Sequence, residues 1–380
     1  MSAPNTKTLA RVALALLAVG GVISTLVWAG PLNPPGGAVS STYKTLTEVE
    51  PRIAINSTNT PGDTDSLYKI TQRGSYYLTG NIVGVAGKHG IEIVASGVTL
   101  DLNGFELAGF ASMGAFDGVS ATTYGLVNIT VVNGSVRNWG QNGINLGLTG
   151  VVGCRIEGVS ASGNTNIGIW AGARAEVSRC IADDSAYGIY TGANSTVQHC
   201  IATYNSSAGI TLGNGSSISD SSAGYNTEGI NLSYGSTAAN CATYTNSGNG
   251  FVANSGCAIS DCVARYNALD GVNCGTACTI TGNTCTLNGT GDGAGIHATG
   301  SDNRIEANNC TSADRGIDVD GAGNIIIKNT CSGNTTNWEM VANNIYGPII
   351  DRSGAATAAV SGSSAASTLS STDPNANFTY

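Results

Sequence analysis

The sequence predicts an all-β protein: a right-handed parallel β-helix of about a dozen coils, with a short N-terminal cap and a flexible C-terminal tail. The first observation behind this prediction is an internal repeat, in which glycine, an apolar residue, any residue and an apolar residue follow one another. Its glycines lie 20 to 25 residues apart, at Gly143, Gly168, Gly188, Gly209, Gly229, Gly250, Gly271, Gly295 and Gly316. Intervals of this regularity indicate a stack of similar coils.

The second observation is a further short strand within each repeat. After a turn, apolar and polar residues alternate, as in Val177–Ala182 and Val197–Ala202, which places one face of the strand inside and the other outside. Repeats of about 21 residues are too short for helical solenoids, whose units have 33 residues or more. They fit a coil that returns above itself, so that each strand pairs in parallel with its counterpart one coil away.

The third observation is the composition. Charged residues make up 11% of the chain, 53 residues are glycine, and 41% are hydrophobic. A disordered chain would carry more charge and fewer large apolar residues. So many small residues favour thin stacked layers over one bulky core.

The chain begins with a predicted signal peptide, because Lys7 and Arg11 precede an apolar run that ends in a small residue. Four segments are expected: a signal peptide at 1–29, a lead-in and N-terminal cap at 30–65, the β-helix at 66–350, and a tail rich in Ala, Ser and Thr at 351–380. We therefore expect a monomer that is secreted or held at the cell surface, with no membrane span after cleavage. The periplasm is an alternative location, and an uncleaved membrane anchor is the alternative reading of the first segment.

Small polar residues form columns at the repeat spacing. One column is an asparagine ladder made of Asn164, Asn205, Asn226, Asn246, Asn267, Asn288 and Asn334, whose amides can hydrogen-bond along the stack. Most of the 11 cysteines also fall in inward columns, where they serve as small core residues. Cys257 and Cys278 share a column and are the best candidates for a disulfide between coils. Ligands in single file do not make a zinc site.

The net charge limits the partners. The formal charge is −9, and it becomes −11 without residues 1–29, which carry two basic residues and no acidic one. This excludes nucleic acid held by charge, and it disfavours anionic polysaccharide bound without a bridging cation. A polysaccharide partner is expected to be neutral, or acidic and bridged by calcium.

The repeat resembles the β-helix repeats of the pectin-lyase-like superfamily, and the rest of the mature chain resembles a group of bacterial secreted β-helix proteins of unassigned function. The stretches that carry this resemblance are Lys44–Leu46, Gly74–Asn81, Val98–Gly104, Tyr346–Ile349 and Asp373–Phe378. It implies the architecture and says little about chemistry. Polygalacturonases of that superfamily carry Asp-Asp, Gly-His-Gly and Arg-Ile-Lys motifs, and here the set is incomplete, since Asn303–Glu306 has Glu in place of Lys.

One group of charged residues is a candidate catalytic site. The repeat register brings Asp270, His297, Arg315 and Asp318 to one face of neighbouring coils, and Asp320 follows on the same strand as Asp318. Lyases of the superfamily use calcium-binding acids with an Arg or Lys base, so Asp318 and Asp320 are candidate calcium ligands. His297 or Arg315 could take a proton if its pKa were lowered. The alternative is an ordinary solvated face, and no cofactor other than calcium is indicated.

Aromatic residues form two further columns. Trp170 and Tyr190 are expected to stack on the early coils, while the other column contains Tyr204, Tyr225 and Tyr266 with Thr245 interrupting it. Aromatic rings in a row can stack on sugar rings. The alternative is that they cover a turn.

Three functions remain open. A noncatalytic glycan-binding or extracellular matrix protein is favoured, because the superfamily's catalytic motifs are incomplete. A polysaccharide lyase or glycoside hydrolase is the first alternative, and a structural or adhesive rod is the second, since a fold alone does not define a function.

Overall fold

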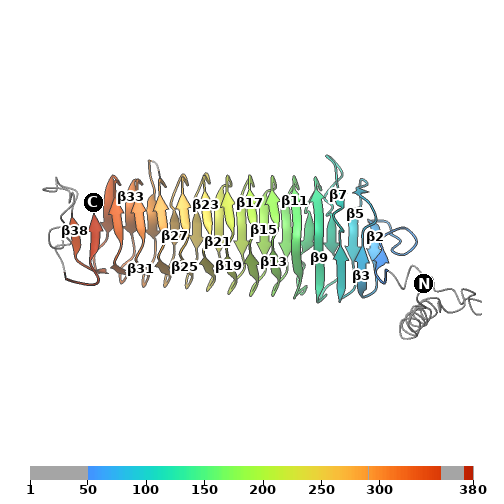
Figure 1. Ribbon diagram of the computed structural model, residues 1–380, viewed down its shortest axis with the longest axis horizontal. Helices are drawn as coiled ribbons and strands as arrows, with labels where there is room; N and C mark the ends of the chain where they lie inside the picture. Colours follow the sequence, from blue (N-terminus) through green and yellow to red (C-terminus); the bar gives the residue numbers. More distant parts are fainter. Residues whose placement is uncertain (1–49, 290, 352–371, 380) are drawn as a thin grey trace, which may run out of the picture. The chain divides into compact units, whose positions relative to one another are not determined.

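The computed structural model describes residues 50–289, 291–351 and 372–379. These residues form strands and turns without a helix, and the strands pair in two parallel sheets of 13 and 26 strands. The strands stack coil upon coil from β2 to β38 (Figure 1). This confirms the predicted parallel β-helix. No helix among the described residues is long and apolar enough to cross a membrane, and the predicted signal peptide lies outside them.

The 13-stranded sheet takes one strand from each coil. Its members are β2 (Ser66–Ile70), β5 (His89–Ile93), β8 (Val119–Ala121), β10 (Ile144–Leu146), β12 (Ile167–Ala171), β15 (Tyr187–Thr191), β18 (Ala208–Leu212), β21 (Glu228–Leu232), β24 (Phe251–Ala253), β27 (Val272–Cys274), β30 (Ala294–Ala298), β33 (Arg315–Val319) and β36 (Thr336–Met340). The repeat glycines found in the sequence lie at the start of these strands. Added Cβ atoms there would collide with the next coil, as at Gly271, 2.6 Å from the Gly295 carbonyl oxygen.

The 26-stranded sheet takes two short strands from a typical coil. The first half of the stack contributes β1 (Ile53–Ala54), β3 (Gly74–Tyr77), β4 (Ile82–Val83), β6 (Val98–Asp101), β7 (Glu106–Ala108), β9 (Ile129–Arg137), β11 (Arg155–Ser162), β13 (Glu176–Ser178), β14 (Ile181–Asp183), β16 (Thr196–Gln198), β17 (Ile201–Thr203), β19 (Ser217–Ser219) and β20 (Ser222–Gly224). The second half contributes β22 (Thr237–Ala239), β23 (Ala242–Tyr244), β25 (Ala258–Ser260), β26 (Val263–Arg265), β28 (Thr279–Thr281), β29 (Thr284–Thr286), β31 (Arg304–Glu306), β32 (Asn309–Thr311), β34 (Ile325–Ile327), β35 (Thr330–Ser332), β37 (Ile345–Tyr346), β38 (Ile349–Asp351) and β39 (Asn377–Thr379).

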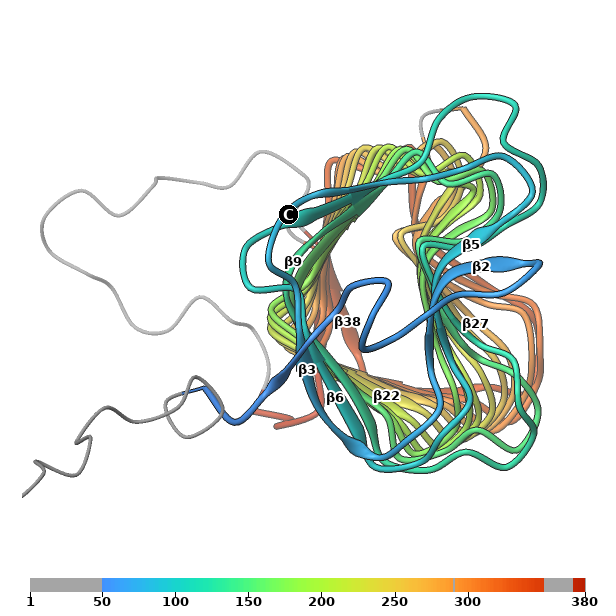
Figure 2. The same ribbon diagram turned by 90° about the vertical axis from the view of Figure 1, so that its right-hand side faces the viewer.

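Each coil turns at three corners, where one residue has left-handed backbone geometry. In the coil of β15 to β17 these residues are Asn194, His199 and Tyr204, with φ of 57°, 53° and 56°. Successive coils superpose in a view along the stack (Figure 2). Because each corner repeats at the same place, its exposed side chains form a column along the stack.

A small residue that is mostly serine, cysteine or asparagine follows the corners of the middle and late coils and points inward, so three ladders run through that part of the stack. The predicted asparagine ladder is confirmed: the Asn205 N–H donates to Asn226 Oδ1 at 2.9 Å, and the Asn226 N–H to Asn246 Oδ1 at 2.9 Å. The other two ladders mix serine, cysteine and asparagine, as where the Cys200 N–H donates to Ser221 Oγ at 3.1 Å. Each such bond contributes about 1 kcal/mol and fixes the register.

The predicted disulfide between Cys257 and Cys278 is not formed. All 11 cysteines lie among the described residues and are buried free thiols. Cys257 Sγ lies 3.1 Å from the Ser233 carbonyl oxygen and Cys278 Sγ lies 3.0 Å from that of Asn254. Each thiol is therefore directed at the backbone of the preceding coil, and the pair is part of a corner ladder.

The core is the interior of the stack. Apolar side chains from both sheets alternate with outward polar ones, and residues such as Ile189, Val197 and Ile210 are fully buried. Burial of one such side chain stabilises the fold by about 1.5–3 kcal/mol. The sheet framework is thus rigid enough to position outward side chains at fixed spacing.

The end of the chain corrects one prediction. Most of the flexible tail predicted at 351–380 lies outside the described residues, but near its end Asn377–Thr379 form β39, which pairs in parallel with β35 and β38. Asn377 is buried and its Oδ1 accepts the Asn329 N–H at 2.9 Å. It extends a corner ladder by one residue, which the repeat spacing could not reveal because Asn377 follows Asn329 by 48 residues.

Candidate functional site

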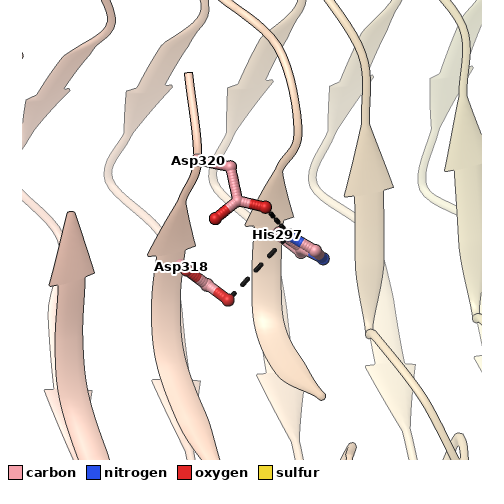
Figure 3. Close-up of side chains that lie close together, drawn as sticks. All are labelled: His297, Asp318 and Asp320. Carbon is pink, nitrogen blue, oxygen red and sulfur yellow. Dashed lines mark hydrogen bonds and ion pairs between the residues drawn. The ribbon is translucent and has the colours of Figure 1, made fainter. Parts of the chain in front are cut away.

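The acid–histidine cluster, which consists of Asp270, His297, Arg315, Asp318 and Asp320, lies on the outward face of β27, β30 and β33. The strand register pairs Asn273 with His297, and His297 with Asp318. His297 faces Asp318 and Asp320 of the next coil (Figure 3). The structure therefore brings together the residues that the sequence placed on one face.

Asp270 anchors the cluster from the coil before His297. Its carboxylate is buried, and Oδ1 accepts the Ala294 N–H at 2.8 Å. Its Oδ2 accepts a hydrogen bond from Asn273 Nδ2 at 2.8 Å and lies 3.0 Å from His297 Nδ1. Burial would raise the pKa of Asp270, but the hydrogen bonds from His297 and Asn273 lower it below its ordinary value.

His297 is held between two carboxylates. Its Nδ1 faces Asp270, and its Nε2 lies 3.1 Å from Asp320 Oδ2. The hydrogen bond to Asp270 raises the pKa of His297 to about 9; burial opposes this shift and Asp320 adds to it. At neutral pH the side chain is an imidazolium, so both ring nitrogens donate.

Arg315 is also fully protonated. Its Nη1 lies 3.0 Å from Asp292 Oδ1 and its Nε lies 2.7 Å from Glu339 Oε2, and these contacts raise the pKa of Arg315. The prediction that one of these side chains takes a proton requires a lowered pKa. The pKa values of His297 and Arg315 are raised instead. Burial raises the pKa of Asp318 above its ordinary value.

Calcium suits this cluster poorly. One oxygen each of Asp318 and Asp320 and one nitrogen of His297 lie within 4.8 Å of one another. Calcium takes six to eight oxygen ligands, and this group offers one oxygen from each of two carboxylates. In addition, the imidazolium of His297 already supplies a positive charge beside them. A second acidic group consists of Asp63, Asp65 and Glu92. It already contains a cation of the chain, because Lys69 Nζ lies 2.7 Å from carboxylate oxygens of Asp63 and Glu92.

The second candidate site is a tyrosine ladder, made of Tyr204, Tyr225, Tyr244 and Tyr266. The rings of Tyr204 and Tyr225 stack at 4.9 Å between centroids with 8° between their planes. Tyr244 then meets Tyr225 and Tyr266 edge to face, at 5.7 Å in each case. The four side chains are 62%, 45%, 41% and 41% exposed.

Tyr244 was missed in the sequence, where Thr245 interrupts the column. It is the last residue of β23, one position before the corner, and its register partner on the previous coil is Gly224. A glycine there leaves room for the Tyr244 ring beside Tyr225. Tyr244 belongs to the column next to the corner column, so the spacing of the corner residues alone does not indicate it.

Three tyrosines of the ladder occupy the left-handed corner. Tyr204, Tyr225 and Tyr266 have φ of 56°, 58° and 58°, where other coils place Asn138, Gly163 and Gly333. This geometry costs a bulky residue roughly 1–2 kcal/mol relative to glycine. Thr245, Leu287 and Ser312 share this corner on other coils, so the backbone does not select for tyrosine, and its recurrence at three positions concerns the exposed side chain.

A groove of about 540 Å³ runs beside the ladder. Tyr204 and Tyr225 line it together with Ser206, Thr227 and Ser247, and Asp184 stands at its N-terminal end. Aromatic rings beside hydroxyl groups match the two faces of a sugar, one apolar and one hydrogen-bonding.

The other predicted aromatic pair is present but smaller. Trp170 and Tyr190 meet edge to face at 6.2 Å, and Tyr187 adds a contact at 6.3 Å to Tyr190. Trp170 is half-buried, and its indole covers Gly147, where an added Cβ would lie 2.1 Å from the ring. This pair therefore covers backbone as well as offering an exposed ring.

The fold is similar to that of several solved proteins. A tailspike protein mutant of E. coli bacteriophage HK620 in complex with pentasaccharide has a TM-score of 0.56 and 14% identity, covering 83% of this chain and 74% of that one. The Azotobacter vinelandii mannuronan C-5 epimerase AlgE4 A-module has a TM-score of 0.52 and 13% identity, covering 78% and 88%. No protein-family model and no curated protein matches the sequence. At these identities the similarity defines the fold: the chain is a parallel β-helix protein.

Proposed function

We propose that this protein is a secreted, noncatalytic glycan-binding β-helix protein whose sugar-binding surface is the tyrosine ladder. The single observation that carries the proposal is the unbroken row of four exposed rings at contacts of 4.9 to 5.7 Å. Three of these rings stand on strained corner backbone, where asparagine or glycine would be more stable. Tyrosine carries this cost on three of four successive coils, with Thr245 on the other, which supports selection for aromatic surface.

The groove beside the ladder supports a carbohydrate as the occupant. Hydroxyl groups of Ser206, Thr227 and Ser247 line it next to the rings. Aliphatic peptide side chains would leave these polar groups unpaired, whereas sugar hydroxyls can both donate to them and accept from them. The tailspike relative of similar fold is complexed with a pentasaccharide, which is consistent with a glycan partner.

The acid–histidine cluster gives less support to an enzyme. A lyase needs a neutral base, and His297 and Arg315 both carry a proton at neutral pH. Secretion rests on the signal-like residues 1–29, in which Lys7 and Arg11 precede an apolar run. A noncatalytic extracellular role fits both observations.

The test is a glycan panel followed by titration of the glycans that bind. Tyr225→Asn and Tyr204→Asn should each weaken binding about tenfold, equivalent to roughly 1.4 kcal/mol for one lost aromatic contact. Asparagine is the matched replacement, because Asn138 occupies the same corner with φ of 58°. Tyr234, which is 60% exposed and outside the ladder, gives the control variant Tyr234→Asn, which should bind like the wild type. Equal binding by all three variants would contradict the proposal, and failure to bind any glycan would favour a structural rod.

A further inference from the structure

The two ends of the tyrosine ladder carry opposite charge. Arg265 lies at the C-terminal end, one coil beyond Tyr244 in the same outward row. Asp183 occupies that row two coils before Gly224, and Asp184 stands at the corner beside it. The aromatic surface therefore runs from a carboxylate pair to a guanidinium group.

Arg265 is held on the ladder itself. Its Cζ lies 4.5 Å above the centroid of the Tyr266 ring, and its Nη2 lies 3.2 Å from Tyr266 Oη. The side chain is exposed, and among the described residues no carboxylate lies within 4.0 Å of its guanidinium. By contrast, Arg155 and Arg304 pair with the nearby Glu157 and Glu306.

A guanidinium fixed by an aromatic ring and lacking a carboxylate partner is prepared for an anionic ligand. Its planar fork binds carboxylate, sulfate or phosphate groups through two parallel hydrogen bonds. Because stacking on Tyr266 already orders the side chain, little conformational entropy is lost when the ligand binds.

The opposite end has the reverse preference. Asp184 lines the groove together with Tyr204, and it lies on the coil that precedes Tyr204. A carboxylate there accepts hydrogen bonds from sugar hydroxyls and repels an anionic group.

We infer that the tyrosine ladder binds a glycan bearing an anionic group in one orientation, with that group on Arg265 and a neutral sugar unit beside Asp184. This inference rests on the proposed function, that the ladder is the glycan site, and adds the class and direction of the ligand. The overall negative charge of the chain repels anionic polysaccharides in general. Arg265 supplies a local positive charge that attracts an anionic group at this one position.

The experiment uses matched pairs of oligosaccharides titrated into the full-length protein. Oligouronates of three kinds, with mannuronate, galacturonate and glucuronate units, are compared with their carboxyl-reduced counterparts, and a sulfated oligosaccharide with its desulfated form. The wild type should bind the anionic member of at least one pair about tenfold more tightly, and Arg265→Gln should abolish that preference. The pair that responds identifies the anionic group as carboxylate or sulfate.

Arg155→Gln is the matched control, since Arg155 is exposed and lies outside the ladder, and it should keep the wild-type preference. Equal binding of both members of every pair, or an anionic preference that survives in Arg265→Gln, overturns the inference while leaving glycan binding intact. Absence of binding to all of these oligosaccharides and to a wider neutral panel overturns the proposed function and this inference together.

Discussion

Two coils far apart in the chain hold a buried aspartate in the same way. Asp117 and Asp270 each precede a glycine at the start of a strand of the 13-stranded sheet, β8 or β27, and both side chains are almost fully buried. One carboxylate oxygen of each accepts a backbone N–H of the next coil, from Asn142 at 2.9 Å and from Ala294 at 2.8 Å. The other oxygen accepts from an outward side chain of its own coil, Ser120 or Asn273.

The two coils differ in the residue that comes from the next coil. Beside Asp117 it is the neutral amide of Asn145, whose Nδ2 donates at 3.0 Å. Beside Asp270 it is His297, at 3.0 Å, with its pKa raised to about 9. A buried aspartate therefore orders the outward side chains by hydrogen bonds in both places. In the acid–histidine cluster one of the donors is charged, and the geometry of this cluster is explained without a catalytic role.

The largest expected effect comes from removing the charge of the two aspartates. Asp270→Asn leaves the imidazolium of His297 without its buried partner, which should reduce the free energy of unfolding by about 3–5 kcal/mol at pH 7. Asp117 also faces a histidine, but His89 Nδ1 accepts the Asp117 N–H at 3.0 Å and lies 3.7 Å from Oδ2. The hydrogen-bond donors to its carboxylate are neutral amides and a hydroxyl, so Asp117→Asn should cost about 1 kcal/mol. Urea unfolding of both variants measures the difference, and equal losses would show that the charge of His297 does not stabilise the fold through Asp270.

The pH dependence sharpens the same comparison. The pKa of His297 is about 9 in the folded protein against an ordinary 6.5, so its contribution to stability is fully present below pH 6.5 and is lost as the pH rises through 9. The wild type should exceed His297→Gln in stability by an amount on the order of 3 kcal/mol at pH 6, and by little at pH 10. A difference in stability that stays constant between pH 6 and pH 10 would contradict the ion pair between His297 and Asp270.

A smaller effect is expected from transplanting the histidine. Asn145→His places an imidazole beside Asp117 without a counterpart of Asp320, because the next outward residue is Trp170. The new side chain should titrate above 6.5 but below the pKa of His297, and the change in stability should stay within about 1 kcal/mol. NMR titration of the ring protons measures both values, and a pKa equal to that of His297 would mean that Asp320 has no influence.

The repeat made much of the fold predictable. Its spacing gave the register, and therefore the vertical neighbourhood of Asn273, His297 and Asp318. The protonation of His297 was not predictable, because it depends on two hydrogen bonds whose geometry periodicity does not encode. Tyr244 was missed for a similar reason, since its ring reaches across from a different column.

The cysteine columns show another limit. Cysteine was expected to be a small apolar core residue, and at Cys310 and Cys331, fully buried on paired strands, this holds. At the corners, however, Cys200 alternates with Ser221, whose hydroxyl accepts the Cys200 N–H. Serine, cysteine and asparagine are thus equivalent at the corners because each offers an acceptor, and the left-handed corner backbone that creates this need is not visible in the spacing.

Whether the tyrosine ladder is the glycan site can be tested by observing which aromatic and histidine side chains respond when a glycan binds. Tyrosine, tryptophan and histidine rings can be followed together by NMR in the full-length protein during titration with an oligosaccharide from the panel. Glycan binding on the tyrosine ladder should shift the signals of Tyr204, Tyr225, Tyr244 and Tyr266 and leave those of Trp170 and His297 unchanged. Shifts centred on His297 and Trp170, with the four ladder rings unaffected, would contradict it.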